Sequence, residues 1–167
     1  MKRRLSPESR VIFLDYDGCL HPGAVYRTRR LGIHLRGHPG LSLFCWSGIL
    51  VELLDPHPDV VLVLSTSWVK SLRFSQAKLR LPIALQERVV SATWHSSMNL
   101  AEWEALTRYG QIMQSVTRHK LRRWLAIDDD TFRWPDISRH RLVICDEHRG
   151  LSDPATEEDL RRKLEIL

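Results

Sequence analysis

Short apolar runs alternate along this chain with longer segments in which apolar residues recur every three or four positions. The short runs predict buried strands, and the longer pattern predicts helices with one apolar face. The predicted strands cover residues 10–17, 60–64, 88–92, 124–127 and 142–145. The predicted helices cover residues 42–54, parts of 70–87, residues 99–116 and residues 154–166, with Ser42 as the first N-cap and a capping box at Thr156 and Asp159.

This alternation predicts an α/β fold, namely a three-layer, Rossmann-like parallel sheet with helices on both faces. A length of 167 residues fits a single domain that spans residues 1–167. Residues 18–41 are rich in Gly, His, Arg and Pro, which predicts a loop or a small hairpin. Neither this segment nor residues 69–98 is long enough to form a large cap domain.

Residues with reactive side chains follow three of the predicted strands. Asp15 and Asp17 end the first strand, and their side chains point the same way because neighbouring residues of a strand alternate. Residues 65–67, Ser-Thr-Ser, follow the second strand, and residues 128–130, three aspartates, follow the fourth. Ligands of parallel α/β sheets bind beyond the carboxyl ends of the strands, so these groups are expected to form one site.

The chain is basic, with a formal charge of +5 and a pI of about 9.4. A basic surface attracts polyanions, so a phosphorylated substrate or nucleic acid is a possible partner, although no nucleic-acid recognition motif is present. Solvated surface charge is the competing interpretation. The basic residues form an early and a late cluster: Arg27, Arg29, Arg30 and Arg36, then Arg118, Lys120, Arg122 and Arg123.

Cysteine content and hydropathy indicate the cellular compartment of the protein. The three cysteines, Cys19, Cys45 and Cys145, are widely spaced and odd in number, which fits a reducing compartment better than a disulfide framework. No run approaches the roughly 20 apolar residues of a membrane span, so no membrane partner is expected. We therefore expect a cytoplasmic protein.

Three segments together resemble the haloacid dehalogenase-like (HAD) superfamily of hydrolases. Residues 13–20, Phe-Leu-Asp-Tyr-Asp-Gly-Cys-Leu, are similar to its first motif, residues 61–65 to its second and residues 126–129 to its fourth. More narrowly, residues 64–68, 124–130 and 149–151 resemble a capless branch known from bacterial proteins of undefined role and from some RNA-repair enzymes.

The resemblance implies a phosphatase that forms an aspartyl-phosphate. Asp15 would be the nucleophile, and Asp17 the general acid and then the general base. Asp15 and Asp128, with the main-chain carbonyl of Asp17 and with Asp129, would hold Mg²⁺. The Ser65 hydroxyl and the amide of Thr66 would bind phosphoryl oxygens.

The family's third motif supplies a cation that balances the negative charge of the site. Arg108, Arg118 and Lys120 are the candidates. Arg108 is favoured because its segment, Arg-Tyr-Gly-Gln-Ile, is similar to the Arg-x-x-Glu-Ile of the capless branch. An ordinary exposed helix arginine is the alternative interpretation of Arg108.

Several other functions are compatible with parts of this pattern. An EF-hand is excluded because Phe13 and Ala24 would stand at its first and twelfth ligand positions. A signalling receiver domain would need its acid pair after the first strand and its acceptor aspartate on a middle strand, whereas the further acids here follow the fourth. A dehalogenase fits less well, since Asp17 serves an oxygen leaving group. A non-catalytic phosphate- or nucleic-acid-binding module on this fold is the remaining alternative. An open site favours a large substrate, such as a phosphorylated nucleic-acid end.

Overall fold

The computed structural model describes residues 4–167 and has a parallel sheet at its centre. Its strands are β1 Arg10–Leu14, β4 Val61–Leu64, β5 Val89–Ala92, β6 Arg123–Asp128 and β7 Leu142–Ile144. Their order is β5-β4-β1-β6-β7, and every neighbouring pair is parallel. The five strands predicted from apolar runs are thus all present, and β1 lies at the centre of the sheet.

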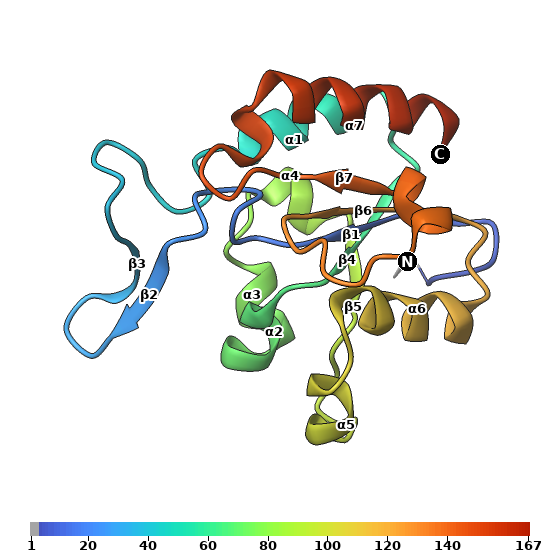
Figure 1. Ribbon diagram of the computed structural model, residues 1–167, viewed down its shortest axis with the longest axis horizontal. Coiled ribbons are helices and arrows are strands. Elements are labelled where there is room, and N and C mark those ends of the chain that lie inside the picture. The colour runs from blue at the N-terminus through green and yellow to red at the C-terminus, as the bar shows by residue number, and fades with distance from the viewer. Residues whose placement is uncertain (1–3) are drawn as a thin grey trace.

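Helices cover both faces of this sheet (Figure 1). α1 Ser47–Leu54 and α7 Pro154–Ile166 lie over one face, and α6 Arg108–His119 covers the other. Side chains of β1 alternate between the two layers, because Ile12 and Leu14 share a core with α1 and α7, whereas Val11 and Phe13 pack with α6. The predicted three-layer, Rossmann-like α/β fold is confirmed.

Two predicted helices have different bounds. The helix expected over residues 42–54 begins at Ser47 with Trp46 at the N-cap position, so the prediction of Ser42 as N-cap is wrong. The helix expected over residues 99–116 is split into α5 Leu100–Glu104 and α6. The Thr107 hydroxyl accepts a hydrogen bond from the Gly110 amide at 3.1 Å, and this N-cap starts a new helix at Arg108.

The predicted capping box of the last helix is also wrong. α7 begins at Pro154 after Asp153 at the N-cap position, so Thr156 lies within its first turn. The Thr156 hydroxyl donates to the Ile144 carbonyl at 3.2 Å and therefore joins the helix to the end of β7.

The segments between the strands are short and build no large cap. Residues 18–41 contain an antiparallel hairpin, which stands out beyond one end of the sheet (Figure 1). Residues 67–86 form three short helices, and two short 3₁₀ segments flank β7. The bounds are β2 Val25–Thr28, β3 Gly32–Leu35, α2 Ser67–Leu72, α3 Phe74–Lys78, α4 Ile83–Gln86, η1 Asp136–Arg141 and η2 Gly150–Ser152. Among the described residues, no helix is long and apolar enough to cross a membrane.

A close backbone contact fixes the loop that follows β1. Gly150 has a φ of +45°, and a Cβ atom at this position would lie 2.4 Å from the carbonyl oxygen of Cys19 and 2.6 Å from the ring of Trp46. The next amide, that of Leu151, donates to the same Cys19 carbonyl at 3.0 Å. Glycine therefore lets η2 pack directly against the loop that carries Asp17.

Candidate active site

The carboxyl ends of three adjacent strands bring together the residues that the sequence singled out. Asp15 follows β1, Ser65 follows β4, and Asp128 is the last residue of β6. The backbone still pairs at this edge, because the Asp15 amide donates to the Ile127 carbonyl at 3.0 Å and the Ser65 amide donates to the Leu14 carbonyl at 2.8 Å. The sheet itself therefore holds the three side chains at neighbouring positions.

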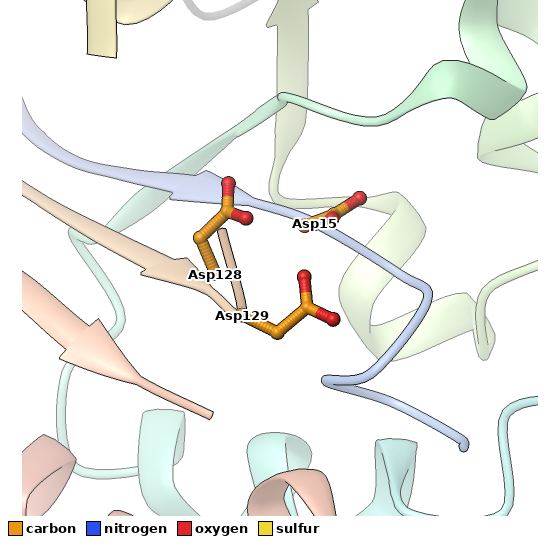
Figure 2. Close-up of side chains that lie close together, drawn as sticks. All are labelled: Asp15, Asp128 and Asp129. Carbon is orange, nitrogen blue, oxygen red and sulfur yellow. The ribbon is translucent and has the colours of Figure 1, made fainter. Parts of the chain in front are cut away.

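Three carboxylates gather at this edge (Figure 2). One oxygen from each of Asp15, Asp128 and Asp129 lies within 4.8 Å of the others. Asp15 and Asp128 are buried, and Asp129 is partly buried. Gly18 makes room for Asp129, since its φ is +74° and a Cβ atom there would lie 2.3 Å from Asp129 Oδ2. Hard carboxylate oxygens at this spacing suit a divalent cation such as Mg²⁺.

Arg108 is the cation that reaches this group. It is the first residue of α6, and its side chain is largely buried. Its Nη2 lies 3.4 Å from Asp15 Oδ2, and its Nε lies 3.0 Å from Asp128 Oδ2. The second contact is a close ion pair without hydrogen-bond geometry, because neither of those two atoms has a hydrogen-bond partner.

The other candidate cations lie elsewhere. Arg118 stands in the last turn of α6, and Lys120 is its C-cap. A helix of 12 residues is about 18 Å long, so both lie at the far end of α6 from Arg108. The structure thus brings Arg108 to the acidic group and does not bring Arg118 or Lys120. The role of Arg108 in charge balance stays a prediction.

Burial and mutual repulsion perturb all three acids. Burial raises the pKa of Asp15, and Asp17 adds to this, although Arg108 lowers it. Burial and the Asp15 carboxylate raise the pKa of Asp128 well above its usual range. The same two causes raise the pKa of Asp129 to about 6. One guanidinium therefore does not offset three carboxylates at this site.

Buried polar atoms that make no hydrogen bond indicate where a ligand fits. In residues 4–167, Ser65 Oγ and Asp128 Oδ2 are two such atoms, and the only contact described for Asp128 Oδ2 is its ion pair with Arg108. Such atoms are costly unless a ligand satisfies them. A carboxylate oxygen suits a cation, and a hydroxyl suits a phosphoryl oxygen, so the donor set fits both predicted ligands. Thr66, the next residue, caps α2 by accepting from the Trp68 amide at 3.4 Å.

Asp17 stands apart from the three clustered carboxylates and is held by different partners. Its Oδ1 accepts from Trp68 Nε1 at 2.8 Å and lies 2.9 Å from His21 Nε2. The Phe44 amide donates to His21 Nδ1 at 3.1 Å, which assigns the proton of a neutral ring to Nε2. His21 thus donates to Asp17. The carboxylate of Asp17 has no place in the acidic group, and metal coordination by its main-chain carbonyl stays a prediction.

His21 and Trp68 were not assigned to Asp17 from the sequence. His21 lies four residues from Asp17 but in a loop, and Trp68 lies 51 residues away on α2. No strand or helix periodicity connects them to Asp17. The one available signal was the position of Trp68 directly after the Ser-Thr-Ser segment, which places it at the rim of the site.

The fold and this site define the class of protein. A parallel sheet with Asp15 directly after β1, Ser65 directly after β4 and Asp128 at the end of β6 is the arrangement of a HAD-type hydrolase domain. The chain matches the family described as "HAD domain in Swiss Army Knife RNA repair proteins" over residues 11–156, and it belongs to that family. No curated protein and no solved structure matches the chain.

The raised pKa of Asp129 predicts a pH-dependent stability of the protein in chelator. In the folded state, Asp129 keeps its carboxyl proton up to a pH of about 6. In the unfolded chain, Asp129 loses this proton near its ordinary pKa of about 4. The folded state then binds more protons, so the free energy of unfolding should fall as the pH rises between these values. Asp129→Asn should remove roughly 1 kcal/mol of that loss, allowing for partial solvent exposure.

Urea unfolding in EDTA at pH 4 and pH 7 measures this effect. The variant is expected to match the wild-type protein at pH 4 and to exceed it in stability at pH 7. Parallel pH dependences of the two proteins would contradict the electrostatic explanation.

Proposed function

We propose that this protein is a Mg²⁺-dependent phosphatase that hydrolyses a phosphate monoester through an aspartyl-phosphate on Asp15. The observation that carries the proposal is the separation of two aspartates from one loop. Asp15 lies in the acidic group beside Arg108, whereas Asp17 is held outside it by Trp68 and His21. Two carboxylates in contrasting environments are the arrangement that assigns one to nucleophilic attack and the other to proton transfer.

In the first step, a carboxylate oxygen of Asp15 attacks phosphorus, and the bond from phosphorus to the leaving oxygen breaks. Asp17 gives its proton to that oxygen, so the alcohol leaves as a neutral molecule. In the second step, water attacks the phosphorus of the aspartyl-phosphate and gives a proton to Asp17. The bond to Asp15 then breaks, which releases phosphate and restores both aspartates.

The other residues stabilise charge. The Ser65 hydroxyl and the Thr66 amide would bind phosphoryl oxygens. Arg108, which already contacts Asp15 and Asp128, would offset the charge that accumulates as the phosphoryl group approaches these acids. Mg²⁺ held by Asp15, Asp128, Asp129 and the Asp17 carbonyl would supply the remaining positive charge.

The substrate that fits this proposal is large and polyanionic, and it is encountered in the cytoplasm. Within residues 4–167, no large cap covers the carboxyl edge of the sheet, and the formal charge of the chain is +5. The family description refers to RNA repair, which favours a phosphorylated nucleic-acid end as the substrate. A non-catalytic phosphate- or nucleic-acid-binding module is the alternative. The phosphate-release assay below distinguishes it from a phosphatase.

We expect the protein to release phosphate from p-nitrophenyl phosphate in MgCl₂ and to stop doing so in EDTA. Asp15→Asn should lower kcat by at least about 10³-fold, because the amide keeps the shape but is not a nucleophile. Asp130→Asn is the matched control and should keep most of the activity. Absence of turnover in the wild-type protein with all substrates would favour the non-catalytic module, and turnover by Asp15→Asn at the wild-type rate would contradict the covalent mechanism.

Removing Arg108 should cost far more than removing Lys120. Arg108→Ala is expected to lower kcat/KM roughly 10²-fold, since it leaves three crowded carboxylates without their guanidinium. Lys120→Ala should stay within about twofold because it lies at the other end of α6. Arg108→Lys should recover part of the loss. The opposite order of effects would show that Lys120 is the charge-balancing residue.

The hydrogen bond from Trp68 to Asp17 should matter most for poor leaving groups. Trp68→Phe removes the N–H that donates a hydrogen bond to Asp17 but keeps an aromatic ring at this position. We expect kcat/KM for an alkyl phosphate to fall about tenfold, because an alcohol needs the proton of Asp17, while kcat/KM for p-nitrophenyl phosphate changes little. Trp103→Phe is the control, because Trp103 Nε1 has no hydrogen-bond partner. Equal losses on both substrates would exclude a role in proton transfer.

A further inference from the structure

We propose that the cavity between the β2–β3 hairpin and α2 binds the leaving group of the substrate, and that this leaving group is the terminal nucleoside of a single-stranded polynucleotide. The cavity has a volume of about 150 Å³ and is lined by Asp17, Tyr26, Arg27, Ile33, Trp68 and Leu72, among others. This inference rests on the proposed phosphatase function, because it assigns a location to the group that leaves.

Asp17 decides on which side of the site the leaving group lies. A general acid must be within hydrogen-bond reach of the oxygen that it protonates. Asp17 lines this cavity, and because Trp68 and His21 both occupy its Oδ1, its Oδ2 is left for the substrate. A larger cavity of about 430 Å³ lies on the other side, beside Arg108 and Asp130, and Asp17 does not line it. A leaving group there would not receive the proton of Asp17.

The walls of the cavity suit a flat ring. Ile33, Trp68 and Leu72 contribute apolar surface, and the ring of Tyr26 at its rim is 47% exposed. The Arg36 guanidinium lies 5.5 Å from the centre of the Tyr26 ring, which leaves an aromatic and cationic pair facing solvent. Bases of single-stranded nucleic acids stack on aromatic rings and on arginine side chains in this manner.

The segment that contains the hairpin has a large net positive charge. Residues 18–51 contain no Asp or Glu and four arginines, so they account for +4 of the formal charge of +5. Within residues 4–167, none of these four side chains lies within 4.0 Å of a carboxylate oxygen. All four arginine side chains are exposed, namely those of Arg27, Arg29, Arg30 and Arg36. A ring-binding cavity that continues into unpaired arginines fits a ligand with alternating rings and phosphates, which is a polynucleotide.

The late basic cluster does not serve this site. Arg118 and Lys120 lie at the end of α6 away from Arg108. Arg122 pairs with Glu8 at 3.1 Å, and the Arg123 side chain donates to the carbonyl of Leu167. The two clusters that look alike in sequence therefore lie at opposite ends of the sheet, and the hairpin cluster is the one beside Asp17.

Turnover of four phosphorylated probes tests the proposal: acetyl phosphate, an acidic phosphopeptide, a phosphorylated single-stranded hexanucleotide, and the same hexanucleotide with an abasic terminal residue. Wild-type kcat/KM should be highest for the intact hexanucleotide. Tyr26→Ala should lower that value about tenfold, with little effect on acetyl phosphate or on the abasic probe, because it removes only ring stacking. The double variant Arg29→Ala and Arg30→Ala should raise KM for both oligonucleotides and flatten their salt dependence. Arg122→Ala is the control and should change neither value.

Several outcomes would overturn the proposal. Equal losses on acetyl phosphate and on the hexanucleotide would show that Tyr26 acts on the chemistry or the fold. A preference for the phosphopeptide would replace the polynucleotide with a protein substrate. If no probe is turned over by the wild-type protein, the phosphatase function fails, and fluorescence anisotropy of a labelled hexanucleotide still tests the binding surface. Binding that Tyr26→Ala weakens would then support the surface, and binding that this substitution leaves unchanged would exclude it.

Discussion

The parallel sheet holds three carboxylates close together against their mutual repulsion, and the arrangement of the site follows from this constraint. Asp15 and Asp128 project from adjacent strands, β1 and β6, and Asp129 joins them because Gly18 leaves room. Only Arg108 among the described residues supplies a full positive charge in direct contact with Asp15 or Asp128. Burial strengthens the repulsion because water cannot screen it. Additional positive charge would relieve this repulsion, and burial and neighbouring acids raise the pKa of all three carboxyl groups.

The second constraint is the course of the short loop that carries Asp15 and Asp17. Asp15 and Asp17 are two residues apart, yet they face different chemical surroundings. The chain leaves the sheet at Asp15, and Gly18 and the contact of Gly150 with Cys19 fix its course beyond that point. The course of the loop places Asp17 against α2, where Trp68 and His21 hold it. The carboxylate of Asp17 is therefore held in a fixed position before any ligand binds.

The absence of a large cap also shapes the surface around the site. The segments that could have formed a lid make a hairpin and three short helices instead. They leave one cavity beside the hairpin and another beside Arg108 and Asp130. The two cavities differ, because Asp17 lines only the cavity beside the hairpin. Exposed arginines lie on that same side. The exposed arginines and the Asp17 carboxylate therefore lie on the same face of the molecule.

The strands, their parallel arrangement and the reactive residues that follow them could be predicted from the sequence. Apolar runs are local signals, and the rule that parallel strands meet at their carboxyl ends converts them into a shared site. The tertiary structure alone decided which residues touch across long separations. Thr107 caps a new helix and so brings Arg108, rather than Lys120, to Asp15. Trp68 reaches Asp17 from α2, and the two basic clusters fall at opposite ends of the sheet. Such contacts depend on how elements pack against one another, and no periodicity along the chain encodes them.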